Sequence, residues 1–459
     1  MKINKSYLKK YNKQGPRYTS YPPANLFTNE YKEADFISAI KKSNIELPKD
    51  ISVYIHIPFC PQICHFCGCT TETGFSYNFI ETYVQSLIKE IDMQKQYIDT
   101  NNRKLIQVHW GGGTPNAIPY KFIKMITEKI RNTFTFSDNY EMAIECSPAY
   151  FKLKHVEILK ELGFNRISLG IQDFDQKVLD AINRKISKIP VKDIISKIKS
   201  EGFTGTNIDL VYGLPLQTVK GFNKTLKKAI DLDVDRIVTF SYAHVPTVIK
   251  RQKVLEDIGL PSSSEKAKMY QNAYEMITQS GYNSIGMDHF SKPSDQFSVA
   301  QQQRKLHRNF QGYCTTETTG QVYGFGASSI SQLYSSYSQN EKNAAKYIKN
   351  IRNKKIPVIR GYSLNNNEKI IRDIINQVMC NFYVDLKEVA KNHNKDIEDV
   401  LKIISFSKDK FIDFINDDIM EINDFKIKVF EMGRIVIRNI AMRFDPLMQK
   451  NTNSYSKTI

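Results

Sequence analysis

The sequence predicts an α/β fold: a partial (β/α)6 barrel with an N-terminal arm and a mostly helical, winged-helix-like C-terminal domain. Two observations support this prediction. Between residues 51 and 328, short apolar runs rich in β-branched residues alternate with amphipathic stretches of helical period. Polar or glycine-rich motifs follow the ends of these runs, where parallel α/β folds gather their chemistry.

The alternation is regular enough to place the individual elements of the barrel. Six segments have the pattern of a buried strand: 53–57, 106–110, 141–145, 166–172, 207–212 and 236–242. Amphipathic helices are expected over 79–98, 119–134, 156–162, 191–201, 219–232 and 264–280. Segment 284–288 is expected to continue or flank the sheet. Right-handed crossovers would place the helices outside the strands.

Two further regions flank the barrel, which is assigned to residues 49–360 with its extension. Residues 1–48 are expected to form an arm, in which the Pro- and Tyr-rich segment 15–23 favours extended chain over helix. Residues 361–459 are assigned to the C-terminal domain, with helices over 368–381, 397–406, 409–416 and 431–442. A hairpin over 419–429, turning at Asn423 and Asp424, predicts the wing, a shape that does not fix function.

The composition excludes several classes of protein. The chain has 459 residues, and its 41% apolar content is typical of a globular protein. It contains no apolar run of about 18 residues, so no membrane span is predicted, and its polar start predicts a cytoplasmic location without a secretory signal. The net charge of +17 comes from dispersed basic residues, which disfavours nucleic acid as a partner. Compositional drift or a polycarboxylate substrate explains it better.

Four cysteines follow the first predicted strand within ten residues: Cys60, Cys64, Cys67 and Cys69. The spacing Cys-x3-Cys-x2-Cys supplies three thiolates, which can hold three corners of a cubane 4Fe–4S cluster and leave one iron open to S-adenosylmethionine (SAM). Zinc is the alternative, but no second Cys or His pair with finger-like spacing follows, and the odd cysteine count disfavours disulfides. We therefore expect Cys60, Cys64 and Cys67 to be metal ligands and Cys69 to be a nearby free thiol.

Glycine and aromatic residues near this loop are candidate SAM contacts. Gly112 and Gly113 would let backbone approach a ligand, and Thr114 adds a hydroxyl, although a glycine triplet is often only a turn. Phe66 would stack on adenine or else be a core aromatic. Tyr54 is expected to point into the barrel, where its hydroxyl would reach the sulfonium or simply be satisfied in the core.

Charged residues at or near other strand ends are further candidates. Glu145, Arg184 and Asp209 would orient ribose hydroxyls and the methionine zwitterion, unless they form ordinary surface ion pairs. Gln172 and Ala243 lie at the ends of the fourth and sixth predicted strands. His109 and His289 are expected to be core histidines.

Two motifs carry a resemblance to a known family. The first is Tyr54-Ile-His-Ile-Pro-Phe-Cys60 with Cys64, Phe66 and Cys67-Gly-Cys69, and the second is His109-Trp-Gly-Gly-Gly-Thr-Pro115. Together they resemble the radical SAM oxygen-independent coproporphyrinogen III oxidase (dehydrogenase) family. Further similar stretches cover nearly the whole chain: 16–22, 163–166, 172–174, 207–210, 242–244, 286–290 and 306–313.

The resemblance implies an anaerobic step of haem biosynthesis on a radical SAM barrel. Two propionates of coproporphyrinogen III would be oxidatively decarboxylated to vinyl groups, giving protoporphyrinogen IX. A 5′-deoxyadenosyl radical from SAM would abstract the hydrogen, while the protein binds, orients and shields. The resemblance also implies a 4Fe–4S cluster, two SAM molecules and a small electron donor of flavodoxin or ferredoxin type. Nothing in the sequence requires more than one copy of the chain, so a monomer is expected.

The resemblance assigns roles residue by residue. The cluster-bound SAM would be contacted by Tyr54, Gly112, Glu145 and Ile330. The second SAM would be contacted by Phe66, Gly113, Thr114, Gln172, Arg184, Asp209 and Ala243. Gln311 and segment 18–22 are the implied substrate contacts, and catalysis is assigned to Tyr54, Cys69 and Gln311.

The chain departs from the family pattern at two places. Ser147 stands where the pattern has an acidic residue, and segment 314–323 differs in sequence. Two alternatives stay open: a related haem chaperone, which segments 16–22 and 306–313 disfavour, and a radical SAM methyltransferase acting on a tetrapyrrole.

Overall fold

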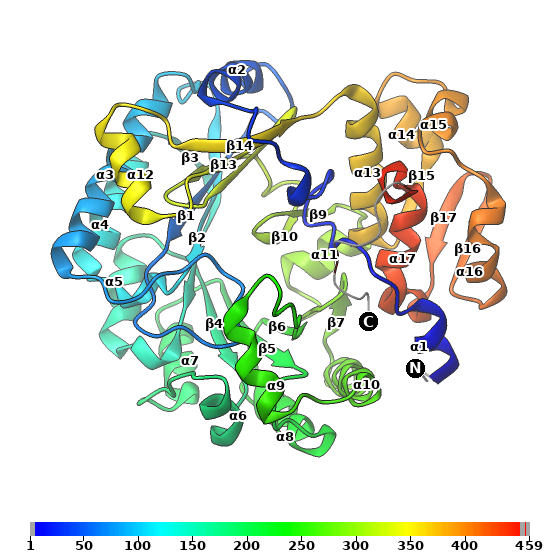
Figure 1. Ribbon diagram of the computed structural model, residues 1–459, viewed down its shortest axis with the longest axis horizontal. Coiled ribbons are helices and arrows are strands. Elements are labelled where there is room, and N and C mark those ends of the chain that lie inside the picture. The colour runs from blue at the N-terminus through cyan, green and yellow to red at the C-terminus, as the bar shows by residue number, and fades with distance from the viewer. Residues whose placement is uncertain (1–4, 450–454, 456–459) are drawn as a thin grey trace.

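The centre of the computed structural model, which describes residues 5–449 and 455, is a twelve-stranded sheet (Figure 1). Six neighbouring strands run parallel in chain order: β1 (Ile51–Ile57), β2 (Lys104–Gly112), β3 (Thr135–Cys146), β4 (Arg166–Gln172), β5 (Gly205–Tyr212) and β6 (Arg236–Ser241). They contain the six strands that the sequence predicts, except that β6 ends one residue earlier. The predicted α/β barrel is confirmed.

Helices connect these strands and lie around the outside of the barrel (Figure 1). The predicted ones are α3 (Tyr77–Lys95), α4 (Tyr120–Arg131), α5 (Leu153–Glu161), α7 (Val191–Ser200), α8 (Val219–Asp231) and α10 (Ser263–Gln279). Helix α8 shows why they form. The Thr218 hydroxyl caps its first turn by accepting from the Gly221 amide, and Phe222 and Leu226 on one face are fully buried. Short helices that were not predicted are α6 (Gln176–Ala181), α9 (Val254–Ile258), α11 (Gln296–Gln302) and α12 (Ala344–Arg352).

The sheet extends beyond both edges of the six parallel strands. Strand β6 pairs with β8 (His289–Ser291), which pairs with β7 (Asn283–Ile285), so segment 284–288 continues the sheet as predicted. Beyond β1 lie β11 (Gln321–Phe325), β12 (Ile330–Leu333), β13 (Ser336–Asn340) and β14 (Val358–Ser363). The sequence analysis did not predict these four strands. In β13 four of the five residues are polar although all five are buried, so no apolar pattern marks this strand. A separate hairpin pairs β9 (Leu306–Asn309) with β10 (Gly312–Thr315).

The C-terminal region is helical with a small sheet, as predicted, but it contains one more strand than expected. Its helices are α13 (Asn366–Asn381), α14 (Leu386–Asn392), α15 (Ile397–Ile403), α16 (Ile412–Asn416) and α17 (Ile437–Ala441). Its three strands are β15 (Tyr383–Asp385), β16 (Met420–Asn423) and β17 (Lys426–Val429). The predicted hairpin turns one residue later than expected, at Asp424 and Phe425, which both have positive φ. The predicted final helix begins as a 3-10 helix over Glu431–Val436.

The N-terminal arm divides between two hydrophobic cores. Its segment 15–23 is not helical, as predicted, but α1 (Lys5–Tyr11) and α2 (Glu33–Ser43) flank it. Phe36 and Ile40 of α2 pack into the core of the barrel, whereas Tyr18 and Tyr21 pack into the C-terminal core. Figure 1 accordingly shows α2 beside the barrel and α1 beside the C-terminal helices. The boundaries at residues 48 and 360 stay predictions.

One buried carboxylate fastens the arm to the end of the chain. Asp445 accepts hydrogen bonds from the hydroxyls of Tyr18 at 2.9 Å and Tyr21 at 3.1 Å, and all three residues are buried. We expect Asp445→Ala to lower the free energy of unfolding by about 2–4 kcal/mol, because both hydroxyls lose their partner. Urea denaturation would measure this. The exposed Asp409→Ala is the control, expected within about 0.5 kcal/mol of the wild type.

No helix in residues 5–449 combines the length and the apolar character needed to cross a membrane.

Candidate active site at the carboxyl ends of the strands

A cavity of about 180 Å³ lies where the loop after β1 meets the carboxyl ends of β2 to β5. Most of the predicted site residues line it. They are Cys60, Cys64, Phe66, Cys67, Cys69, Gly112, Gly113, Thr114, Glu145, Gln172, Arg184 and Asp209. The topology thus brings together residues that lie up to about 150 positions apart, as expected for strand ends of a parallel barrel.

The cysteine loop is held in place by main-chain hydrogen bonds at several points. The Cys60 amide donates to the Glu72 carbonyl at 3.0 Å, and the His65 amide donates to the Ile182 carbonyl at 2.9 Å. Asn183 fixes the centre of the loop, because its side chain donates to the Ile63 carbonyl at 2.8 Å. The loop therefore has a defined shape without depending on the cysteine side chains.

The thiols differ in their electrostatic surroundings. Burial raises the pKa of the Cys60 and Cys64 thiols, although Arg184, which lies 3.5 Å from the Cys64 sulfur, opposes this for Cys64. Hydrogen bonding from Cys69 lowers the pKa of Cys67 to about 6, and the Cys69 amide donates to the Cys67 sulfur at 3.4 Å. Cys67 is therefore the residue with thiolate character, and Cys69 acts on it as a donor.

The donor set fits a cubane cluster better than a single metal ion. Cys60, Cys64 and Cys67 line one cavity from one loop. Among the residues that the structure describes, no three His, Cys, Asp or Glu side chains converge on one point, as a single zinc ion would require. In a cubane each thiolate binds a different iron, so the three sulfurs need not converge.

The glycines after β2 are required by the contact between the ends of β1 and β2. A Cβ on Gly112, whose φ is +109°, would lie 2.7 Å from the His56 ring, and one on Gly113 would lie 2.6 Å from the Phe59 carbonyl oxygen. The Thr114 hydroxyl lies 3.1 Å from the Cys60 sulfur. The motif therefore packs the cysteine loop against the barrel, and its contact with SAM stays a prediction.

The acidic candidates face the cavity rather than forming surface ion pairs with Lys or Arg. Glu145 Oε1 lies 2.9 Å from His109 Nε2; burial opposes the charge on His109, but Glu145 raises its pKa above the ordinary value. Asp209 accepts from Ser168 at 3.1 Å and from Asn207 at 2.9 Å, and burial raises its pKa. Arg184 donates to the Gly170 carbonyl and the Cys64 sulfur.

A second cavity, of about 250 Å³, lies inside the barrel and shares Glu145 and Asp209 with the first. Gln311, predicted to contact substrate, lines this barrel cavity, and its buried Oε1 atom has no hydrogen-bond partner. His109 and His289 also line it, so they are not the core residues that the sequence suggested.

Three predicted contacts lie outside both cavities. The Tyr54 hydroxyl donates to His56 Nδ1 at 3.0 Å, an internal partner that sequence reasoning did not find. The Ala243 carbonyl lies near the cysteine loop, because Gln252 donates both to it and to the Phe66 carbonyl. Ile330 packs against the cluster formed by Phe27, Tyr337 and Leu364. The structure does not bring these three side chains to the cysteine cavity.

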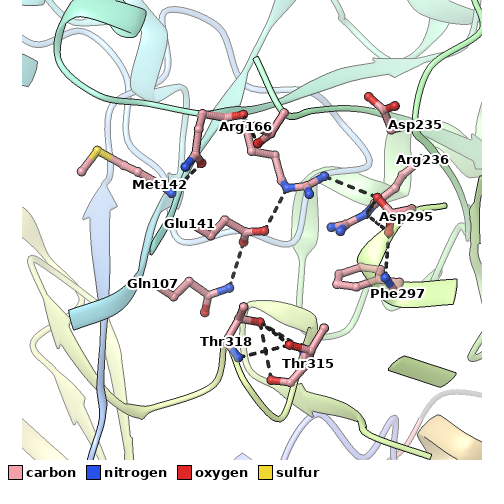
Figure 2. Close-up of polar contacts among 12 residues, drawn as sticks. Gln107, Glu141, Met142, Arg166, Asp235, Arg236, Asp295, Phe297, Thr315 and Thr318 are labelled. Carbon is pink, nitrogen blue, oxygen red and sulfur yellow. Dashed lines mark hydrogen bonds and ion pairs between the residues drawn. The ribbon is translucent and has the colours of Figure 1, made fainter. Parts of the chain in front are cut away.

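The amino end of the barrel holds a buried ionic network that the sequence analysis missed (Figure 2). Arg166 donates to Glu141 at 2.9 Å, and Arg236 donates to Asp295 at 2.9 Å. Gln107 donates to Glu141 at 3.0 Å, and the Phe297 ring lies over Arg236. All of these residues except Asp295 line the barrel cavity. Arg166 and Arg236 are the first residues of β4 and β6, so they lie at the opposite end of these strands from the cysteine loop. The sequence could have revealed this network, because Arg166 and Arg236 are the first residues of β4 and β6 and lie on the inward face that alternates along each strand.

His56 should make stability depend on pH. Burial lowers its pKa from 6.5 to about 4, so the folded state binds fewer protons than the unfolded state between these values. The folded state therefore has its full stability, as far as His56 is concerned, above about pH 6.5. As the pH falls to about 4, the free energy of unfolding decreases by roughly 3 kcal/mol. Urea denaturation across this range would show a shallower pH dependence for His56→Gln than for the wild type. Equal slopes would contradict the assignment.

Comparisons with known proteins agree with this geometry. Residues 54–229 match the radical SAM superfamily. Proteins named oxygen-independent coproporphyrinogen III oxidase are similar along their length. The one from Synechocystis is 36% identical, covering 97% of this chain and 95% of its own. The one from Escherichia coli K12 is 36% identical, and the similarity covers 96% of this chain and 95% of that protein. The solved structure of E. coli coproporphyrinogen III oxidase, described as a radical SAM enzyme, has a TM-score of 0.89 at 34% identity, covering 97% of this chain and 99% of that one.

Proposed function

The chain belongs to the family of oxygen-independent coproporphyrinogen III oxidases, and from this premise we propose that it converts coproporphyrinogen III to protoporphyrinogen IX by oxidative decarboxylation of two propionates. The observation that carries the proposal is the cavity in which three thiols of one loop face Glu145, Arg184 and Asp209. The reaction is the oxygen-independent one of haem biosynthesis, and the enzyme is an oxidoreductase.

Cys60, Cys64 and Cys67 would hold the 4Fe–4S cluster. When bound, the cluster and SAM together supply a 5′-deoxyadenosyl radical, which removes hydrogen from the propionate side chain. The low pKa of Cys67 favours the thiolate that metal binding requires. The Arg184 guanidinium near Cys64 balances the negative charge of the thiolates.

The remaining residues of the cysteine cavity would bind and orient SAM. Glu145, held by His109, is placed to accept from an ammonium group or a ribose hydroxyl. Asp209 of β5 and Arg184 of the loop after α6 also face the cavity and suit a zwitterionic or hydroxylated ligand. We propose that two SAM molecules bind. Gly112 would contact the cluster-bound SAM. The second SAM would be contacted by Phe66, Gly113, Thr114, Gln172 and Ala243.

Tyr54, whose hydroxyl lies 3.0 Å from His56 Nδ1, and Ile330 of β12 would contact the cluster-bound SAM. Gln311 and segment 18–22 would contact the tetrapyrrole. Cys69 would tune Cys67 and take part in electron or proton transfer without binding iron. A small flavodoxin- or ferredoxin-type protein would supply electrons to a monomeric enzyme in the reducing cytoplasm.

Anaerobic turnover tests this function directly. The purified chain, reconstituted with iron and sulfide, is incubated with a reductant, SAM and coproporphyrinogen III. We expect protoporphyrinogen IX, having lost two carboxyl groups, together with 5′-deoxyadenosine, measured by chromatography and mass spectrometry. A product that has gained a methyl group would contradict the proposal. So would stable capture of added haemin without any turnover of coproporphyrinogen III.

A further inference from the structure

The cysteines of this chain provide one place for a redox cluster. Four of the seven lie in the cysteine loop, whereas Cys146, Cys314 and Cys380 are far apart in sequence and buried. Cleaving a sulfonium to a thioether and a carbon radical takes up one electron, which the cluster must receive first. Because the chain has no second group of cysteines to relay this electron, we expect it to enter across the surface nearest to the cysteine loop.

The segment after β6, residues 246–258, packs directly on the cysteine loop. Arg251 donates to the Cys67 carbonyl at 3.1 Å, and Gln252 donates to the Phe66 carbonyl at 3.1 Å. A Cβ on Gly68 would lie 3.5 Å from the Ile249 side chain. We call residues 246–258 the loop cover. A protein that rests on the loop cover would therefore be one layer of residues away from Cys67.

The loop cover exposes several apolar side chains to solvent. Val248 is 80% exposed, and Val254 and Ile258, which lie four positions apart on α9, are 45% and 36% exposed. They are three of the ten large apolar residues that are exposed in the described part of the chain. Single exposed apolar residues are ordinary, but a group of them marks a contact surface. Their concentration beside the cysteine loop points to a protein partner.

The surface around the cysteine loop also carries a net positive charge. Residues 60–76, residues 182–190 and the loop cover together contain six basic and three acidic residues. Two of the acidic residues have partners: Glu72 accepts from the Ala344 amide at 3.1 Å, and Glu256 lies 2.7 Å from His244. The third, Asp257, is exposed. This balance favours a partner with an acidic surface.

Four exposed lysines provide most of this positive charge: Lys185, Lys188, Lys250 and Lys253. Within residues 5–449, none of them forms an ion pair with a carboxylate of the chain. Exposed charges of this kind contribute little to the stability of a fold. They attract an oppositely charged protein and raise the rate at which it associates.

We propose that the loop cover, with Lys185 and Lys188 beside it, is the docking surface for an acidic one-electron carrier protein. This inference rests on the proposed function and names the place where the electron donor binds. The carrier is oxidised by one electron, the cluster held by the cysteine loop is reduced by one, and no atoms are exchanged. A few apolar contacts combined with charge attraction suit a carrier that binds briefly and leaves, as in small electron-transfer complexes.

A double charge reversal tests the electrostatic part of the surface. Lys250→Glu with Lys253→Glu changes the loop cover. Lys391→Glu with Lys402→Glu is the control, because it makes the same change of charge at two exposed lysines of α14 and α15. The anaerobically reconstituted protein is mixed with reduced flavodoxin, an acidic carrier, and cluster reduction is followed by visible absorption. At low salt we expect the loop-cover variant to be reduced about tenfold more slowly and the control like the wild type.

A small reductant shows whether the cluster itself is intact in these variants. Photoreduced deazaflavin is uncharged and needs no docking surface. We expect it to reduce the cluster of the wild type and of both double variants at the same rate.

Val248→Asn tests the apolar part of the surface without a change of charge. Binding of oxidised flavodoxin, measured by calorimetry, should weaken about fivefold at both low and high salt. The double charge reversal in the loop cover should weaken binding at low salt and approach the wild type at high salt. Ile412→Asn is the control, since Ile412 of α16 is 50% exposed but lies in the C-terminal region.

Cluster reduction and turnover are separate measurements, so the inference and the proposed function can fail separately. If flavodoxin reduces the loop-cover variants as fast as the wild type while protoporphyrinogen IX forms, the inference fails and the function stands. If flavodoxin reduction depends on this surface but no protoporphyrinogen IX forms, the function fails and the docking surface stands. A wild type that flavodoxin does not reduce overturns the inference. Equal slowing in the control variant, or slower reduction by deazaflavin, would also overturn it.

Discussion

Replacing Cys64 with alanine is expected to abolish iron binding and turnover together. A cubane that loses one of three thiolates is poorly held, and Arg184 would lose its contact with the Cys64 sulfur, which lies 3.5 Å away. The loop itself should keep its shape, because main-chain bonds and Asn183 fix it. Iron and sulfide content, the visible absorption of the reconstituted protein and the yield of 5′-deoxyadenosine would measure the loss.

Cys69→Ala is the matched comparison for this variant. Cys69 lies in the same loop, yet the geometry makes it a donor to Cys67 rather than a ligand. We expect this variant to retain iron, with weaker activity because Cys67 loses the Cys69 side-chain hydrogen bond, the larger of the two that lower its pKa, while the main-chain amide of residue 69 still donates to it. Normal iron content and turnover in the Cys64 variant would refute the ligand assignment. Loss of iron in the Cys69 variant would make Cys69 a ligand instead.

The largest effect on stability is expected from Asp295→Asn at the amino end of the barrel. Asp295 accepts two hydrogen bonds from Arg236, and the two side chains are 5% and 6% exposed, respectively. Neutralising Asp295 would leave Arg236 and the nearby Arg166 with Glu141 as their remaining acidic partner. Removing one member of a buried pair costs about 3–5 kcal/mol, which urea denaturation would detect.

The choice of asparagine separates the charge of Asp295 from its role as a helix cap. Asp295 caps α11 by accepting from the Phe297 amide at 2.8 Å, and asparagine caps nearly as well. Asp175→Asn is the control, since the exposed Asp175 caps α6 in the same way. Its stability should change by less than about 0.5 kcal/mol. If the Asp295 variant were as stable as this control, the network of Figure 2 would have no stabilising role.

Local sequence patterns predicted the parallel barrel and most of its site. In β4 the apolar residues Ile167, Leu169 and Ile171 alternate with polar or small residues, and the succession of such strands with amphipathic helices predicts a parallel sheet. Because the carboxyl ends of parallel strands meet at one edge, the positions of the cysteine loop, Glu145 and Asp209 in sequence already placed them together. The pattern of apolar residues in the sequence could not reveal β13, because four of its five buried residues are polar.

The sequence by itself therefore determined the six-stranded barrel, the loop of three thiols and the resemblance to a family. The tertiary structure alone decided which polar residues became partners. It placed His109 against Glu145, divided the arm between two cores, and brought Arg17, Lys266, Arg434 and Arg438, from three distant segments, to one cavity. It also showed that Tyr54 and Ile330, which were predicted to contact SAM, do not line the cysteine cavity. The physical reason is that periodicity reports which face of an element is buried, whereas the partner of a buried charge depends on contacts between segments hundreds of residues apart.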